Sequence, residues 1–83
     1  MAVYVDRLCN HNMIMYNKYV KSCHLYASSR DELISFAVNE LGLQSRWIQK
    51  SRIGILHFDL TENKRKLAIE SGALEIRSYL EII

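Results

Sequence analysis

Hydrophobic and polar positions along the chain predict two amphipathic helices set between short strands. The first helix spans residues 29–41, where apolar side chains recur every three or four positions and form one stripe. Ser29 and Glu32 make a capping box at its start, and Gly42 supplies the left-handed residue that commonly ends a helix. The stripe consists of Leu33, Ile34, Ala37, Val38 and Leu41.

The second helix follows directly on an apolar strand at residues 53–60. Thr61 caps this helix, Glu62 suits its first turn, and Gly72 ends it. The near-continuous apolar run before Thr61 predicts a strand that is covered on both faces. The narrower apolar side of the helix consists of Leu60, Leu67, Ala68 and Ser71.

Three further segments, residues 2–6, 21–27 and 74–82, alternate in the manner of strands. Because strand residues two apart share a face, His24 and Tyr26 point one way and Cys23 and Leu25 the other. The last segment turns inward the side chains of Leu74, Ile76, Leu80 and Ile82. Residues 7–20 show no clean periodicity, and we expect them to form a long hairpin connection or flap.

The resulting order, ββαβαβ, predicts one domain over residues 1–83, of the α/β class. We expect a small mixed sheet of about four strands with two packed helices, joined by right-handed parallel crossovers. His57 and Asp59 share a face of their strand, and with Asp6 they fall near strand exits. Open α/β sheets place ligand crevices at such exits, so we expect a site there.

The composition indicates the cellular compartment of the protein more than its function. Of the 83 residues, 49% are hydrophobic and 24% charged, which is typical of a globular protein. No apolar run approaches the ~20 residues that span a bilayer, and the first residues form a strand pattern and not a signal peptide. We therefore expect a cytoplasmic protein without a membrane partner, whose Cys9 and Cys23 are reduced.

Cations cluster in residues 46–52 and 64–66, although the formal net charge is only +2. Lys64, Arg65 and Lys66 lie near the positive end of the second helix, where the helix dipole disfavours them. A bound anion would resolve this conflict, so we expect an anionic ligand at the helix N-terminus. The ligand-binding residues that we predict are Asp6, His24, Arg46, Trp47, His57, Asp59, Lys64 and Arg65.

Imidazole and carboxylate side chains could also bind Zn, Mn or Fe, and His24, His57, Asp6 and Asp59 are the candidates. Their spacing matches no standard metal motif, and a hydrogen-bonded His–Asp pair is the commoner outcome. Cys23 cannot act as a nucleophile with His24, because neighbours on a strand face opposite ways. We therefore assign no metal, cofactor or catalytic residue, and favour a protein that is not an enzyme.

Trp47 lies beside Arg46 in the basic segment between the first helix and the apolar strand. An aromatic base could stack on this tryptophan with cations on its phosphate. A single tryptophan in a small domain is more often a core anchor, which is the interpretation that we favour for Trp47. For Arg46 we favour a role in binding.

Several motifs in this order resemble a small phage and bacterial family known as domain of unknown function 4031. They are Val-Tyr-Val-Asp6, His24-Leu-Tyr-Ala, Leu41-Gly-Leu, Arg46-Trp47-Ile-Gln49, His57-Phe-Asp59-Leu, Lys64-Arg65 and Gly72-Ala73. The resemblance covers nearly the whole chain and departs mainly in residues 7–20 and 50–56. It implies that these motifs characterise the family, and it is consistent with a phage-encoded origin, which would place the protein in the host cytoplasm. It implies no activity.

Together these observations predict a small non-catalytic binding module for an anionic, nucleotide-like ligand. If the protein is phage-encoded, it could act against host defence by sequestering a nucleotide signal, and it could form a homo-oligomer. One alternative is a module that binds nucleic acid or blocks a host protein through residues 46–52. A second alternative is a small metal-dependent hydrolase that uses His24, His57, Asp6 and Asp59.

Overall fold

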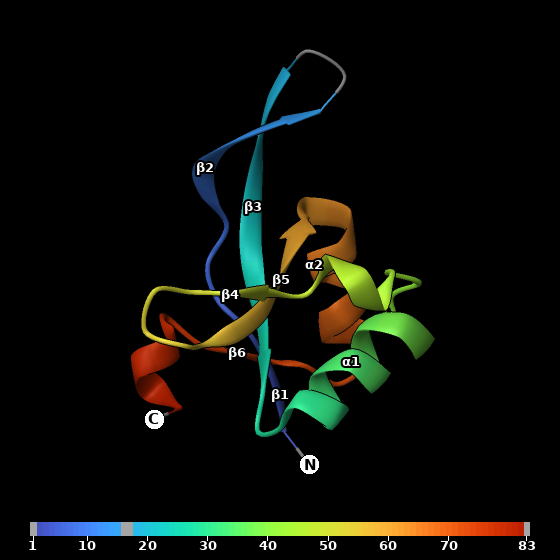
Figure 1. The fold of residues 1–83 in the computed structure, drawn as a ribbon. Helices are drawn as coiled ribbons and strands as arrows, with labels where there is room; N and C mark the ends of the chain where they lie inside the picture. Colours follow the sequence, from blue (N-terminus) through green and yellow to red (C-terminus); the bar gives the residue numbers. More distant parts are fainter. Residues whose placement is uncertain (1, 16–17, 83) are drawn as a thin grey trace.

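The computed structural model describes residues 2–15 and 18–82, with side chains for residues 2–9 and 21–82. Its sheet has the strand order β4-β5-β3-β1-β6, and β2 pairs with β3 (Figure 1). The strands are β1 Val3–Val5, β2 Cys9–Met15, β3 Lys18–Ala27, β4 Gln49–Lys50, β5 Leu56–Thr61 and β6 Leu74–Glu75. The expected mixed sheet with two packed helices is confirmed, with six strands among the described residues and not about four.

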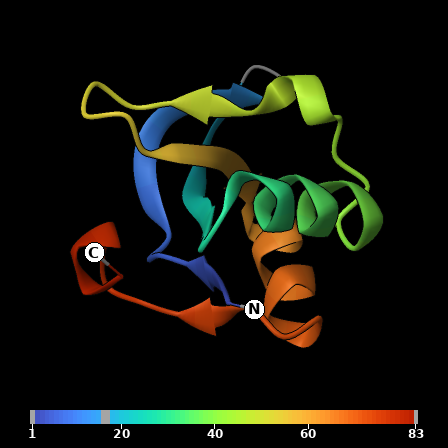
Figure 2. The same cartoon turned by 60° about the horizontal axis from the view of Figure 1, so that its bottom comes forward.

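Both helices, α1 (Arg30–Asn39) and α2 (Glu62–Glu70), lie on the same side of the sheet (Figures 1 and 2). The caps form as predicted, because the side chain of Ser29 accepts from the backbone N–H of Glu32 and that of Thr61 from the N–H of Lys64. Two short 3₁₀ helices complete the fold: η1 (Ser45–Trp47) and η2 (Tyr79–Glu81). Neither α1 nor α2 is long and apolar enough to cross a membrane.

The core fills the space between the sheet and the two helices. Alternate residues of β3 and β5 are fully buried there against the stripe of α1, whereas the intervening residues face the other way. This core confirms the predicted stripe of the first helix at Leu33, Ala37 and Leu41. Its largest members from the strands are Val5, Cys23, Leu25, Phe58 and Leu60.

The crossover that follows β3 differs from the prediction. β3 and β5 are antiparallel, because the chain first forms β4 and then turns back into β5 beside β3. The sequence pattern does not reveal β4, since it has only two residues and both are exposed. The crossover through α2 is parallel as expected: β6 pairs in parallel with β1, which runs in the same direction as β5.

The long hairpin connection expected for residues 7–20 is itself built of paired strands. Most of this segment forms β2 and the first part of β3, an antiparallel ribbon that extends beyond the rest of the sheet (Figure 1). Only residues 16 and 17 of the segment lie outside the described chain. A ribbon that projects beyond the core needs no apolar face, which explains why the segment lacks periodicity.

Several predicted apolar contacts are also wrong. The alternating segment 74–82 leaves the sheet after Glu75, because β1 is too short to pair with more of it, and both Leu74 and Leu80 are exposed. Ile53 is 66% exposed, since it lies in the turn between β4 and β5 and not in a strand. Leu67 and Val38 sit at the edges of their helix stripes and are partly exposed.

Candidate metal centre

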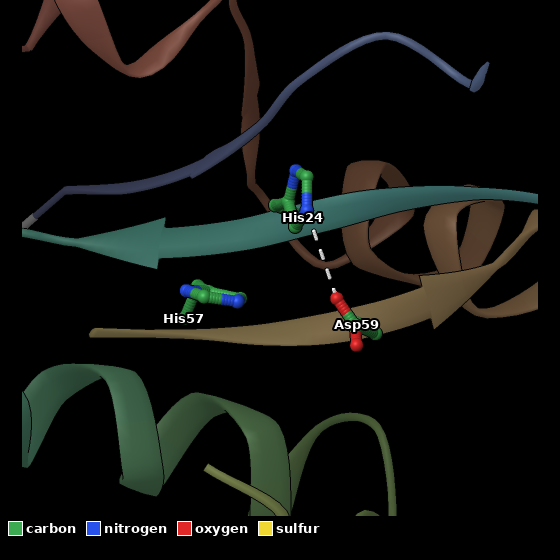
Figure 3. Close-up of side chains that lie close together, drawn as sticks. All are labelled: His24, His57 and Asp59. Carbon is green, nitrogen blue, oxygen red and sulfur yellow. Dashed lines mark ion pairs between the residues drawn. The ribbon is translucent and has the colours of Figure 1, made fainter. Parts of the chain in front are cut away.

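The face of the sheet turned away from the helices carries a group of polar side chains. His24 on β3 lies directly opposite Asp59 on β5, and His57 lies two residues before Asp59 on the same face. Figure 3 shows the three side chains gathered over these neighbouring strands. They lie within their strands, so the site is on the sheet surface and not at the strand exits where we expected it.

Asp6 fixes the position of His24. This aspartate directly follows β1, and its carboxylate accepts the backbone N–H of His24 at 2.6 Å and pairs with ring atom Nδ1 at 2.8 Å. The side chain of Asp6 is only 13% exposed and that of His24 only 26%. The hydrogen bond to Asp6 raises the pKa of His24, and burial opposes this shift only in part. With Nδ1 held by Asp6, Nε2 lies toward Asp59, 3.7 Å from Oδ1.

His57 and Asp59 are held in a similar way. Nδ1 of His57 lies 3.2 Å from the carbonyl oxygen of Ile55, which can only accept, so Nδ1 carries the proton in this contact. Gln49 on β4 donates from Nε2 to Oδ2 of Asp59 at 2.7 Å. The rings of His24 and His57 meet edge to face, with centroids 5.0 Å apart. Each side chain of the cluster is therefore positioned by a second group.

The donor set fits a transition metal. His24, His57 and Asp59 each offer one ligand atom, and these three atoms lie within 4.8 Å of one another. Ligand atoms ~2.0–2.2 Å from a tetrahedral metal lie about 3.4 Å apart, so the side chains would have to close by up to about 1.4 Å to bind one ion. In the neutral tautomers with the proton on Nδ1, both histidines present the Nε2 lone pair, as metal-binding histidines do.

Tyr26 completes this face and was missed as a site residue. It is only 6% exposed, and its ring lies 5.8 Å from His24 and 6.2 Å from His57, measured between centroids. Burial raises its pKa to about 12, so the hydroxyl stays protonated at neutral pH. Its position two residues after His24 already placed it on the same face. Gln49 stands in the family-like motif Arg46-Trp47-Ile-Gln49, which was the one sequence signal for it.

Two of the predicted ligand-binding cations make contacts within the protein. Lys64 donates from Nζ to the carbonyl oxygen of Leu41 at 2.6 Å, close to the C-terminal end of α1. Arg65 donates to the carbonyl oxygen of Asp6 at 2.9 Å and to Glu75 at 3.1 Å. These contacts offset the dipole conflict inferred from the sequence, and Arg65 also supports the segment that carries Asp6.

The other two predicted residues, Arg46 and Trp47, lie on η1 and are exposed. Trp47 is 48% exposed, so the interpretation as a core anchor is wrong. Gln49, in the segment that follows η1, donates a hydrogen bond to Asp59 of the candidate metal centre. The structure thus brings together Asp6, His24, His57 and Asp59, while Arg46 and Trp47 form a separate exposed surface.

A comparison with known families agrees with the motif pattern. A family model described as protein of unknown function (DUF4031) matches residues 3–82, which is nearly the whole chain. Neither a curated protein nor a solved structure matches the chain. Any functional conclusion therefore depends on the geometry of the site.

Proposed function

Because this chain belongs to the DUF4031 family of unknown function, we propose from its geometry that it is a small metal-dependent hydrolase. The observation that carries the proposal is the arrangement of His24. Asp6 holds one ring nitrogen, and the other lies toward Asp59 and the ring of His57. This carboxylate–histidine arrangement is the common way of orienting a histidine toward a metal. The hydrogen-bonded pair expected from the sequence thereby becomes part of a metal site.

Three protein ligands favour a catalytic role over a structural one. Structural zinc sites are usually closed by four protein ligands, whereas catalytic sites keep a position for water or substrate. The cluster also lies on the sheet face opposite the apolar core, so the fold does not depend on a metal to close it. Asp59 is 30% exposed and leaves the site accessible from solvent. Two histidines and one carboxylate suit Zn, Mn or Fe(II).

His24, His57 and Asp59 would hold the ion. A divalent metal held there would lower the pKa of a bound water and so supply hydroxide for hydrolysis near neutral pH. Gln49 donates to Oδ2 of Asp59, which leaves Oδ1 as the oxygen that could bind the ion. Asp6 keeps the proton of His24 on Nδ1.

The second candidate function is recognition of nucleic acid or of a host protein by the exposed surface of Arg46 and Trp47. The exposure of Trp47 supports it, because a half-exposed indole beside a cation can stack on a base. The counterion release that accompanies such binding makes its affinity fall steeply with salt. Titration with short oligonucleotides at about 50 and 200 mM salt tests it, with Trp47→Ala as the variant that should lose binding.

The binding module at the N-terminus of α2 has less support, since Lys64 and Arg65 make the internal contacts described above. A role against host defence would apply to the hydrolase equally, through hydrolysis of a nucleotide signal. The setting that we propose is the cytoplasm, that of the host if the protein is phage-encoded. Self-association remains part of this proposal.

Metal content and hydrolysis test the proposal together. Elemental analysis of freshly purified protein should find about one ion per chain, and His57→Ala should lose it. Hydrolysis of bis(p-nitrophenyl) phosphate should stop after treatment with EDTA and return on addition of Zn or Mn. Lys66→Ala, on the exposed side of α2, is the matched control that should keep both properties. Absence of metal together with an unchanged melting temperature in added Zn or Mn would overturn the proposal.

A further inference from the structure

A cavity of about 410 Å³ lies close to the metal centre. It is bounded by β1, the start of α1, the turn before β5 and η2, and its walls include Tyr4, Tyr26 and Tyr79 with Ile55 and Leu56. Tyr26 belongs to the lining of the cavity, and its ring centroid lies 6.2 Å from that of His57, so the two sites share this side chain. The volume falls within the ~300–1,000 Å³ that is typical of sites for small molecules.

A row of four aromatic rings connects the cavity to the metal centre. The ring centroid of Tyr79 lies 6.3 Å from that of Tyr26, which lies 6.2 Å from that of His57. His57 in turn meets His24 at 5.0 Å. Tyr26 is therefore the shared wall, with the cavity on one side and the two histidines on the other. A molecule that fills the cavity must project its exposed end toward the metal ligands or toward solvent.

The chemistry of the lining indicates what fits. Tyrosine rings and aliphatic side chains favour a flat aromatic ring, which gains by stacking and by leaving water. Arg30 and Ser28 are polar, exposed members of the lining, and Arg30 adds a positive charge at this end of the cavity. A flat ring with acceptor atoms at its edge matches both features, because Arg30 and Ser28 can donate to these atoms. The bases of nucleotides are common rings of this kind.

We propose that this cavity binds the base of a nucleotide, so that the phosphate of the same molecule reaches the metal centre. The position of the phosphate rests on the proposed hydrolase function, whereas binding of the base does not. The substrate class is thus nucleotides, with the base held against the tyrosine rings of the lining. Tyr26 separates the base from the histidines.

Binding of the base and binding of the phosphate can be tested separately, and metal-free protein is used first to test the base. In EDTA, titration calorimetry with the four common ribonucleosides should detect binding of at least one of them. Ribose 5-phosphate, which has the phosphate without the base, should not bind. Tyr79→Ala should weaken the nucleoside at least tenfold and Tyr79→Phe much less, because the ring supplies the contact. Leu80→Ala, an exposed neighbour on η2, should leave the affinity unchanged.

Adding Zn then tests the phosphate. The corresponding 5′-monophosphate should gain affinity with the metal, whereas the nucleoside should not. Nucleoside binding that depends on Tyr79 but never responds to metal would support the base cavity and overturn the hydrolase. Absence of nucleoside binding, or equal affinity for ribose 5-phosphate and the nucleotide, would overturn the base cavity, even if the metal binds. Phenylalanine amide bound more tightly than any nucleoside would also overturn it, in favour of a peptide ligand.

Discussion

The carboxylate of Asp6 accepts two hydrogen bonds from His24, one from the backbone N–H at 2.6 Å and one from the ring Nδ1 at 2.8 Å. A single aspartate therefore sets both the backbone position and the ring orientation of this histidine. Arg65 holds the same segment through the carbonyl oxygen of Asp6. The candidate metal centre is thus supported by the residue that follows β1 and by α2, neither of which supplies a proposed ligand.

Replacing Asp6 with Asn should weaken metal binding roughly 10- to 100-fold, as is usual when the group that orients a metal-binding histidine is removed. The amide oxygen can still accept the backbone N–H of His24, but the NH₂ group cannot accept a hydrogen bond from Nδ1. The proton of the ring is then no longer held on Nδ1, and Nε2 is no longer kept available for the metal. Competition with a chromophoric zinc chelator measures the affinity. Asp31→Asn, exposed on α1, is the control that should match the wild type. Equal affinity in the two variants would mean that Asp6 does not orient the ligand.

A prediction for the hydrophobic core concerns Leu41. This residue lies between α1 and η1 and is only 1% exposed. Leu41→Ala should lower the free energy of unfolding by ~2–5 kcal/mol, because the side chain leaves a cavity that its neighbours cannot refill. Urea denaturation measures the change. Leu80→Ala removes the same atoms from a side chain that is 63% exposed and should cost less than about 0.5 kcal/mol. Similar losses at both positions would contradict this assignment of the core.

The two cysteines should differ in reactivity. Cys9 is exposed, whereas Cys23 is buried, and burial, followed by the charge of Asp6, raises the pKa of Cys23 to about 12. Because the thiolate is the reactive form, iodoacetamide at pH 8 should label Cys9 and spare Cys23 in the folded protein. Mass spectrometry should find one modification in the native state and two after denaturation. Rapid native labelling of Cys23 would show that the sheet opens locally.

Neighbouring lysines on α2 provide a matched pair. Lys64 donates a charged hydrogen bond of 2.6 Å to the carbonyl oxygen of Leu41, whereas Lys66 is 69% exposed. Lys64→Met should reduce the free energy of unfolding by about 1–3 kcal/mol, because the carbonyl loses a charged partner. Lys66→Met should change it by less than about 0.5 kcal/mol. If Lys64→Met is equally neutral, the lysine is not structural and its expected role in ligand binding gains support.

Local rules in the sequence were enough for the helices and for the faces of the strands. Ser29, Thr61, Gly42 and Gly72 mark helix ends through contacts that span only a few residues, and all four act as expected. The period of two likewise placed His24 with Tyr26, and His57 with Asp59, on common faces. Such features depend on backbone geometry that each segment carries by itself.

Only the tertiary structure decided which strands pair and which of their side chains become neighbours. The period of two gives the direction of a side chain but neither the neighbouring strand nor the register. His24 meets Asp59 because β3 pairs with β5, and it meets Asp6 because β1 lies on the other side of β3. The two-residue β4 brings Gln49 to Asp59, and α2 brings Arg65 to Asp6. These pairings arise from packing the whole core at once, since burial of Leu25, Phe58 and Val5 selects a strand order that no local segment encodes.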